Sequence, residues 1–506
     1  MICVTIAKET NQGLRESWQR AARAGAKLVE LRLDYLIEPV DWALLLRDRP
    51  TPVLVTVRRT IDGGRWAGDE SHRRTLLAEA SANGADWVDV EVDIAPQFPR
   101  SGISRRVVSF HDMNSTPEQL SEIAQACAEG DADLVKLAVM ARSLRDAFRL
   151  LDTIRLSHAN RPTMGLAMGP LGQFTRVANA RSGTNWTYAA WESETPPAPG
   201  MLSFDDLASI YHYESINHDT LLYAVIGDPV GHSKSPLVHN AAFRHHGLNK
   251  SYVPVRVPTE ELGWFLQNCG GYGFRGLSVT IPHKEAVMAP LAEACPLVRL
   301  TGSCNTVMIE PEENGRHYRL SGFNTDLDAA LGSLVEALPP GPQGTVATLA
   351  EVNVLLLGAG GVARSLAFGL SREGSNLTIV NRTADRAEAL AAETGATAAL
   401  WADRDRLAQK ATVIINGTSL GMSPQVDLSP LGPDCFHAGQ VVFDTIYIPE
   451  WTVFLKSARA AGARTLSGVD MFIRQAAIQS QLFSGGKEPP VRLMAEKLRA
   501  ALSPAL

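Results

Sequence analysis

Several charged side chains of the first 200 residues stand in or beside apolar, β-branched runs. Glu30 and Arg32 lie two positions apart in KLVELRLD, so they share one face of a strand. Lys136 stands inside DLVKLAV, where an amine among apolar residues becomes a nucleophile toward carbonyls. His111 closes RRVVSFHD and can transfer protons near neutral pH. These residue types together indicate nucleophilic attack on a carbonyl with proton transfer.

Arginines near the same positions are candidates for holding an anionic group. Arg58 closes PVLVTVR, Asp62 lies in the loop that follows, and Arg176 comes later in GPLGQFTRV. A guanidinium binds a carboxylate through paired hydrogen bonds. Taken singly, each residue has an ordinary alternative, since a strand lysine can point outward and Glu30 with Arg32 can form a structural ion pair. Five or more such residues at one end of a fold favour a site.

The elements that must position these residues recur with a regular rhythm. Short β-branched runs alternate with amphipathic helical patterns, which is typical of a (β/α)8 barrel. In such a barrel the active site lies at the carboxyl ends of the strands. The rhythm breaks near residues 195–207, so we predict a barrel domain over residues 1–215. The expected strands cover residues 2–7, 27–34, 52–58, 87–93, 105–112, 133–139, 163–168 and, less regularly, 184–191.

A nucleotide-binding pattern follows a segment rich in Pro, Gly and Thr at residues 336–350. VLLLGAGGVARSLA places Gly358, Gly360 and Gly361 at a strand-to-helix turn, where the backbone can approach a pyrophosphate. The next strand ends in Asn381-Arg382-Thr383, where NAD sites usually carry an acid. Arginine there suits a 2′-phosphate and predicts NADP. The end of VIINGTSLGM, with Thr418 and Met422, is expected beside the nicotinamide.

A second reactive set lies between the predicted barrel and this pattern. LSVTIPHKEAV carries Lys284, and GFNTDLDA carries Asp326. Reduction of a ketone needs a proton donor beside the oxygen, and a lysine oriented by an aspartate can supply it. For each piece alone, helix-capping polar residues with a surface lysine remain the alternative.

The segments ELRLD, TVRR followed by DGG, SFHDMNSTP, LVKLAV and GPLGQFTRV resemble, in order, the type I 3-dehydroquinate dehydratase family. The resemblance implies that Lys136 forms an imine with the substrate ketone, while His111 removes a proton and later protonates the departing hydroxyl. The acid that orients this histidine is usually Glu, and here it is Asp62. The closing loop usually reads Ser-Ala-Pro-Gly-Gln, whereas residues 197–201 read Pro-Ala-Pro-Gly-Met. Substrate binding is implied for Glu30, Arg32, Arg58 and Arg176.

Residues 221–495 resemble the shikimate dehydrogenase family through GDPVGHSKSP, LSVTIPHKE, GSCNTV, GFNTD and MFIRQAA. The resemblance implies that Lys284 and Asp326 are the catalytic pair for reducing 3-dehydroshikimate with NADPH. The presence of Ser235 and Thr280 favours shikimate over quinate. Two alternatives remain: a quinate/shikimate dehydrogenase with a weakened dehydratase half, and a non-catalytic metabolite sensor. Substrate binding is implied for Ser233, Ser235, Thr280, Asn305, Tyr447 and Gln475.

Composition sets the remaining expectations. The chain has 506 residues, 45% hydrophobic and 20% charged, with a formal net charge of -6 that gives no general attraction to nucleic acid. Six scattered cysteines without a CxxC pair favour reduced thiols in a cytoplasmic protein and no metal site. No apolar run is long enough for a membrane span. We expect small-molecule substrates and no obligatory protein partner. The predicted α/β domains are the barrel, a substrate domain at 221–335 plus 468–506, and a Rossmann-type domain at 336–467.

Overall fold

The computed structural model describes all residues except 101, 183–185, 192–195, 314–316, 340–346 and 503–506. The chain divides into two compact units. The first comprises Met1–Pro236 and Asn249–Phe274, and the second comprises Leu237–Leu248 and Arg275–Leu506. The predicted strand at 184–191 and the predicted connection at 336–350 lie partly outside the described residues. The three domain boundaries given above therefore stay predictions.

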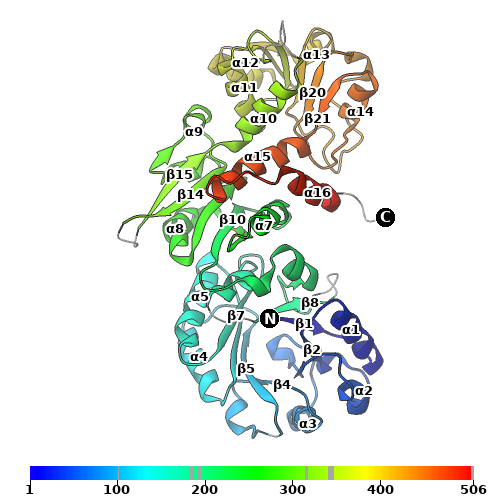
Figure 1. Cartoon of the computed structure of the whole chain (residues 1–506), viewed down its shortest axis with the longest axis vertical. Coiled ribbons are helices and arrows are strands. Elements are labelled where there is room, and N and C mark those ends of the chain that lie inside the picture. The colour runs from blue at the N-terminus through cyan, green and yellow to red at the C-terminus, as the bar shows by residue number, and fades with distance from the viewer. Residues whose placement is uncertain (101, 183–185, 192–195, 314–316, 340–346, 503–506) are drawn as a thin grey trace. The chain divides into compact units, whose positions relative to one another are not determined.

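A parallel sheet of nine strands dominates the first unit, in the order β7-β6-β5-β4-β3-β2-β1-β8-β9 (Figure 1). Neighbouring strands pair in register along the sheet, as in Thr5 with Glu30 and Ser109 with Lys136. The eight main strands confirm the predicted α/β barrel architecture. Their bounds are β1 Ile2–Ile6, β2 Leu28–Arg32, β3 Val53–Thr56, β4 Trp87–Glu91, β5 Arg105–Asp112, β6 Leu134–Met140, β7 Thr163–Met168 and β8 Thr187–Ala190, with the short β9 Leu202–Ser203 beyond.

Helices between these strands start and pack as their sequences dictate. The first helix begins after Thr10, whose hydroxyl accepts from the Gly13 amide, and it buries Leu14 and Trp18 at helical spacing. The fifth begins with a capping box of Ser143 and Asp146. The bounds are α1 Asn11–Arg23, α2 Trp42–Leu46, α3 Glu70–Ala82, α4 Leu120–Glu129, α5 Leu144–His158 and α6 Thr175–Ala178.

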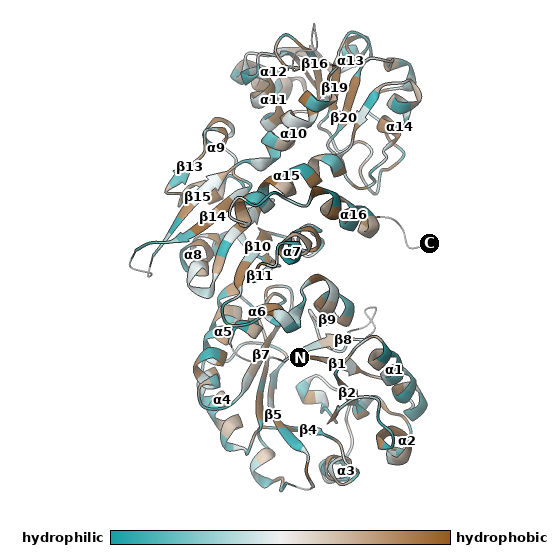
Figure 2. Cartoon of the chain, in the orientation of Figure 1, coloured by the Kyte–Doolittle hydropathy of each residue, from teal (hydrophilic) through white to brown (hydrophobic). Residues whose placement is uncertain are grey.

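The barrel strands are brown over much of their length in Figure 2, with teal segments at polar residues, and the helices around them are mixed. Aromatic rings fill part of this core. Trp87 meets Trp186 edge to face at 4.9 Å between ring centroids, and Trp186 stacks on Tyr188 at 6.3 Å. This stack connects the barrel core to the site described below.

The first unit also contains a later segment of the chain. Strands β10 (Leu221–Gly227) and β11 (Lys250–Arg256) pair in parallel. A short 3-10 turn, η7 (Thr259–Glu261), then leads into α8 (Leu262–Asn268).

In the second unit, β14 (Thr306–Pro311) pairs antiparallel with β15 (Tyr318–Phe323), and β12 (Phe274–Val279) pairs antiparallel with β14. Buried apolar residues of α7 pack with those of α15 and α16. The other bounds are α7 Ser235–His245, β13 Glu293–Ala294, α9 Pro296–Thr301, α10 Thr325–Ala337, α15 Gly468–Phe483 and α16 Val491–Leu502.

A second parallel sheet in this unit has the order β18-β17-β16-β19-β20-β21. This is the order of dinucleotide-binding folds, in which the ligand lies where the strand order reverses, here between β16 and β19. The predicted Rossmann-type fold is confirmed. The bounds are β16 Asn353–Leu357, α11 Gly361–Arg372, β17 Asn376–Asn381, α12 Ala384–Thr394, β18 Thr397–Leu400, α13 Arg404–Ala408, β19 Val413–Asn416, β20 Val441–Asp444, α14 Val453–Ala460 and β21 Arg464–Leu466.

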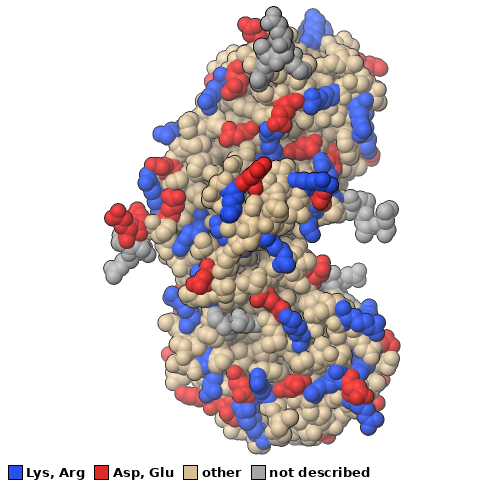
Figure 3. Space-filling view, in the orientation of Figure 1, with Lys and Arg blue, Asp and Glu red and all other residues tan. Residues whose placement is uncertain are grey.

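Charged side chains are spread over the surface. Basic and acidic residues alternate over the face shown in Figure 3. Among the described residues, no helix combines the length and the apolar character that crossing a bilayer requires.

Candidate active sites

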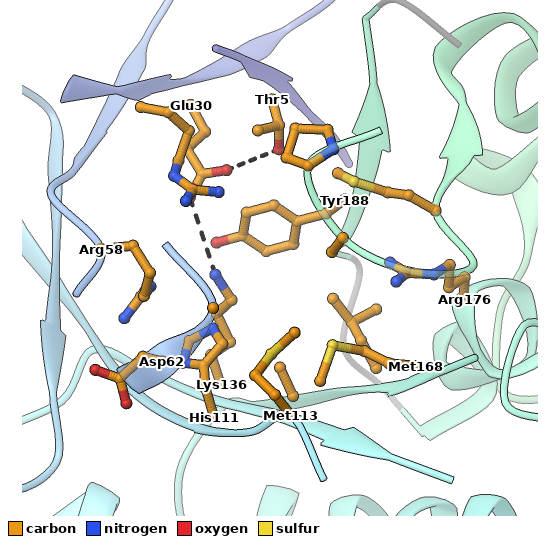
Figure 4. A pocket seen from close by; sticks show the side chains of 17 residues that line it. Thr5, Glu30, Arg58, Asp62, His111, Met113, Lys136, Met168, Arg176 and Tyr188 are labelled. Carbon is orange, nitrogen blue, oxygen red and sulfur yellow. Dashed lines mark hydrogen bonds and ion pairs between the residues drawn. The ribbon is translucent and has the colours of Figure 1, made fainter. Parts of the chain in front are cut away.

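One pocket of the barrel collects every site residue predicted for the first half of the chain. They lie on different strands or in the segments that follow them, and Figure 4 shows the labelled ones around a common space. Apolar side chains complete the lining. The predicted residues are Glu30, Arg32, Arg58, Asp62, His111, Lys136 and Arg176, and the others include Thr5, Met113, Met168, Tyr188, Pro197, Ala198 and Met201.

Lys136 lies at the centre of this pocket, on β6. Its Nζ is 3.1 Å from Asp89 Oδ2, 3.9 Å from Glu30 Oε1 and 4.0 Å from the centroid of the Tyr188 ring. The prediction of apolar surroundings is therefore wrong for the tip of the side chain. The amine is held in one place by two carboxylates and an aromatic face, which is the arrangement that a positioned nucleophile needs.

Asp89 on β4 is a site residue that the sequence reasoning missed. It is fully buried, and its Oδ2 lies 2.6 Å from the Arg58 guanidinium while Oδ1 accepts from Ser109 Oγ at 2.5 Å. Burial alone would raise the pKa of Asp89, but Arg58 and Lys136 hold it below its ordinary value. The signal in the sequence was WVDVEVD, in which an acid alternates with valine three times. Two of these acids, Asp89 and Glu91, lie on the strand and share its inner face.

Most charges of the pocket are already matched by a partner. Glu30 accepts hydrogen bonds from the hydroxyls of Thr5 at 2.7 Å and Thr56 at 2.8 Å. Arg32 makes a bidentate pair with Asp34, both contacts being 2.8 Å. Arg58 reaches Glu91 at 2.7 Å in addition to Asp89. The guanidinium groups of Arg32 and Arg58 are therefore already paired with carboxylates of the protein before a carboxylate ligand binds.

Arg176 differs from the other arginines. It is 1% exposed, and the one hydrogen bond of its side chain among the described residues goes to the backbone oxygen of Pro199, at 3.2 Å. Its Nε is buried with no hydrogen-bond partner in the part of the chain that the structure describes, and burial lowers the pKa of Arg176 to about 10. Because a buried guanidinium without a counter-charge is unfavourable, this side chain is prepared for an anion that enters the pocket.

His111 and Asp62 both line the pocket but do not pair. The Asp62 carboxylate instead accepts from Arg59 Nε at 2.6 Å, and Nδ1 of His111 is buried without a hydrogen-bond partner in the described part of the chain. The contact that the resemblance implied between these residues is thus not formed in this structure. Burial, reinforced by Arg58 and Lys136, holds the pKa of His111 well below its ordinary value. The neutral imidazole is the form that accepts a proton.

Thioether and proline side chains also line the pocket. They belong to Met113, Met168, Met201 and Pro197. Loop residue Pro199 is tied to Arg176 by the hydrogen bond described above. The altered loop thus contributes apolar surface where the resemblance implied a polar side chain.

In the second unit, Lys284 and Asp326 form the pair predicted for proton transfer. Lys284 Nζ lies 2.6 Å from Asp326 Oδ2, and both side chains are partly exposed. Asp326 stands in the first turn of α10, whose start is capped by Asn324. Thr280 lies before the turn that carries Lys284, since its carbonyl oxygen accepts from His283 N at 3.0 Å.

Asn305, predicted to bind substrate, is buried and fastens α10. Its Oδ1 accepts from the Thr325 amide at 2.8 Å, and its Nδ2 donates to Thr325 Oγ1 at 3.0 Å. Gln479 of α15, which the sequence reasoning missed, donates to Thr306 Oγ1 at 2.7 Å and accepts from Ser278 at 2.8 Å. This buried network positions the helix turn that carries Asp326.

The glycine turn after β16 fits a dinucleotide. Gly358 has φ +109°, and a Cβ there would meet the Gly417 oxygen at 2.8 Å, so only glycine fits. At Gly360 and Gly361 a Cβ would meet nothing within 4 Å, which leaves open space at the start of α11. No side chain caps that start among the described residues. A pyrophosphate can therefore accept from its amides.

The remaining predicted residues occupy loops or helix starts. Arg382 is exposed after β17 and has no ion-pair partner among the described residues, while Asn381 Nδ2 donates to the Thr383 oxygen at 2.9 Å. Thr418 Oγ1 donates to Asn416 at 2.7 Å beyond β19, and Met422 is exposed on that loop. Tyr447 packs on Phe472 at 6.0 Å, Gln475 is buried on α15, and Ser233 Oγ accepts from the Ser235 amide at the start of α7.

Comparison with known proteins follows the same division. The sequence model of the type I 3-dehydroquinase family matches residues 2–218. A bifunctional 3-dehydroquinate dehydratase/shikimate dehydrogenase of Arabidopsis thaliana chloroplasts is 35% identical, over 97% of this chain and 83% of its own length. The chain belongs to this bifunctional family.

The dehydrogenase half of this family member has its own relatives. Models of the shikimate dehydrogenase substrate-binding domain, of shikimate/quinate 5-dehydrogenase and of the C-terminal domain match residues 225–307, 343–423 and 468–499. The NADP+-dependent shikimate dehydrogenase of Moorella thermoacetica is 40% identical over 57% of this chain and 95% of its own. A crystal structure of a shikimate dehydrogenase with NADP+ superposes with a TM-score of 0.51 at 35% identity, covering 57% of this chain and 98% of that one.

Proposed function

We propose that this chain dehydrates 3-dehydroquinate in its barrel and reduces the product, 3-dehydroshikimate, to shikimate with NADPH in its second half. One observation carries the first activity. Seven side chains chosen from sequence line one pocket, with a fixed amine facing it and a buried arginine that has no counter-charge among the described residues. Membership of the bifunctional family supports the order of the two reactions.

In the dehydratase, Lys136 Nζ adds to the ketone carbon, and loss of water gives an imine. The neutral His111 removes a proton from the neighbouring carbon, and the electron pair of that C–H bond moves toward the imine. The same residue then returns a proton to the departing hydroxyl, which leaves as water. Hydrolysis of the imine releases the product and restores the amine. Arg176 binds the substrate carboxylate, and Glu30 binds ring hydroxyls.

In the dehydrogenase, bound NADPH supplies the hydride that reduces the ketone carbon. Lys284 donates a proton to the carbonyl oxygen, and Asp326 orients the lysine through the 2.6 Å contact. The amides at the start of α11 bind the pyrophosphate, and Arg382 binds the 2′-phosphate. Thr280, Tyr447 and Gln475 of the second unit are proposed substrate ligands, while Asn305 acts through α10. Ser233 and Ser235 are proposed as substrate ligands on the family resemblance.

Trapping tests the dehydratase directly. The full chain is incubated with 3-dehydroquinate and reduced with borohydride, and peptide mass spectrometry locates the adduct. An adduct on Lys136 is expected. Absence of any adduct together with absence of dehydration would refute this half of the proposal while leaving the dehydrogenase untouched.

Substitution tests the dehydrogenase. Lys284→Ala is expected to lose most hydride transfer while NADPH still binds, as followed by quenching of protein fluorescence. Near-normal turnover in this variant would contradict the assignment. Turnover on shikimate and on quinate, compared in the unmodified enzyme, separates the proposed activity from that of a quinate dehydrogenase. A cytoplasmic location, small-molecule substrates and independence from nucleic acid and membrane remain proposals that rest on composition.

A further inference from the structure

The segment Asn249–Phe274 lies well beyond the predicted barrel in sequence, and its residues fall within the match to the dehydrogenase substrate-binding domain. It nevertheless belongs to the same compact unit as the barrel. Its turn η7 and helix α8 contact the barrel helix α5, and its last residue, Phe274, contacts Phe174 at the start of the barrel helix α6. We call this stretch the docking segment.

A buried carboxylate of the docking segment caps the start of α5. Glu261 Oε2 accepts from the Leu144 amide at 2.7 Å, and Oε1 accepts from the Arg145 amide at 3.4 Å. The capping box of Ser143 occupies only the Asp146 amide, so these first-turn amides depend on Glu261. A carboxylate at this position also matches the positive end of the helix dipole.

An aromatic cluster seals the same contact. Phe148 of α5, 1% exposed, meets Tyr272 at 4.5 Å, Trp264 at 5.4 Å and Phe265 at 6.0 Å between ring centroids. Phe174, just before α6, lies 5.3 Å from Phe148. Without the docking segment these barrel rings would be exposed to water.

Polar contacts fix the relative position of the two surfaces. The Tyr272 hydroxyl donates to Asp152 of α5 at 2.6 Å. The Arg145 guanidinium stacks over Trp264 at 5.4 Å, and Arg181 donates to the Tyr272 backbone oxygen. Directional bonds of this kind specify one geometry in addition to apolar burial.

Both barrel elements touched by the segment are close in sequence to proposed site residues. Helix α5 follows β6, the strand that carries Lys136. Phe174 stands two positions before Arg176, and its ring also meets Phe274 at 6.5 Å. A shift of Phe174 would move the short helix α6 and the guanidinium that it carries into the pocket.

We propose that the docking segment, although part of the dehydrogenase by family, is a working part of the dehydratase: it fixes α5 and α6 and thereby positions Arg176. The inference rests on the proposed role of Arg176 in holding the substrate carboxylate. Glu261 and Phe274 are positioning residues in this scheme, since they act through barrel elements and touch no substrate.

The test uses the full chain with Glu261→Ala, and with Phe274→Leu as a second variant should the first fold poorly. Glu260→Gln is the matched control, because Glu260 is the exposed neighbour of Glu261. We expect Glu261→Ala to raise the dehydratase KM by about fivefold. The KM of the dehydrogenase, its kcat and the dehydratase kcat should stay within about twofold of the parent. Amide exchange over residues 144–148 should accelerate.

Two results would overturn the inference. One is unchanged dehydratase KM and unchanged exchange in both variants. The other is a parallel loss of both activities, which would mean general unfolding rather than positioning. If the parent enzyme does not dehydrate 3-dehydroquinate, the proposed function fails, yet the exchange rates of α5 still decide whether the docking segment holds the barrel.

Discussion

Replacing Arg176 by Met should change activity and stability in opposite directions. The guanidinium is buried beside Met168 and Met201 without a counter-charge among the described residues, and one hydrogen bond to Pro199 holds it. Methionine has a similar length and no charge, so it fills the same space. The substrate carboxylate then loses its partner, and the free protein loses a buried charge.

The size of both effects follows from the structure. Lowering of the pKa of Arg176 from 12.5 to about 10 corresponds to roughly 3 kcal/mol of unfavourable burial, at 1.36 kcal/mol per unit. Removing the charge recovers this free energy, but loss of the hydrogen bond to Pro199 offsets about 1.5 kcal/mol of it. The variant should therefore gain about 1–2 kcal/mol, or about 2–8 °C in the unfolding temperature of a domain of this size. Loss of the charge-assisted bonds to substrate should reduce dehydratase kcat/KM by about 100- to 1000-fold.

Differential scanning calorimetry and a dehydratase assay measure the two effects on the same samples. Arg47→Met is the control, because Arg47 is exposed and makes no ion pair with any described residue; it should alter neither quantity. A variant of Arg176 that unfolds at a lower temperature would refute the account of the buried charge. One that keeps kcat/KM within about threefold would refute its role in binding.

Three further outcomes are expected. Asp89→Asn should destabilise the barrel by about 3–5 kcal/mol and impair dehydration, because it leaves Lys136 and Arg58 with one fewer buried charged partner. Urea unfolding and turnover measure the two effects, and a stable, fully active variant would contradict the prediction. The pKa of His111 is held below 6.5, so the imidazole stays neutral above pH 6.5. The neutral base and the stability that it contributes are lost only as the pH falls below 6.5. An acid limb of dehydratase kcat/KM at or above pH 6.5 would argue against His111 as the base. Arg382→Gln should raise the KM for NADPH by about 10- to 100-fold and leave the KM for NADH unchanged. An equal rise in both KM values would contradict the proposed contact of Arg382 with the 2′-phosphate.

Much of the fold was predictable because its signals are local. The β-branched runs and the glycine turn with Gly358 are set by neighbours in sequence, and the structure confirms both folds. The side chains that gather in the barrel pocket were also predictable, since several charged residues at one end of a fold favour a site even where each alone has a structural alternative. Local signals identify which residue types are present and on which strand face they stand.

The partners of those residues were not predictable, because they depend on packing between distant strands. Asp89 lies beside Lys136 only because β4, β5 and β6 are neighbours in the sheet. Asp62 contacts Arg59 rather than His111. The loop geometry that decides this is not encoded in the motif. The amide oxygen and nitrogen of Asn305 both bond to Thr325, a contact that no sequence pattern indicates.

The stack of Trp87, Trp186 and Tyr188 gives the barrel a built-in optical reporter. Tyr188 places the face of its ring 4.0 Å from the amine of Lys136, and Trp186 lies against that ring at 6.3 Å. A covalent change at the amine alters the electrostatic field on these rings, so the emission of Trp186 should follow each turnover. Stopped-flow fluorescence without NADPH can thus time the chemical steps of the dehydratase without a label, while NADPH absorbance times the dehydrogenase in a separate mixture.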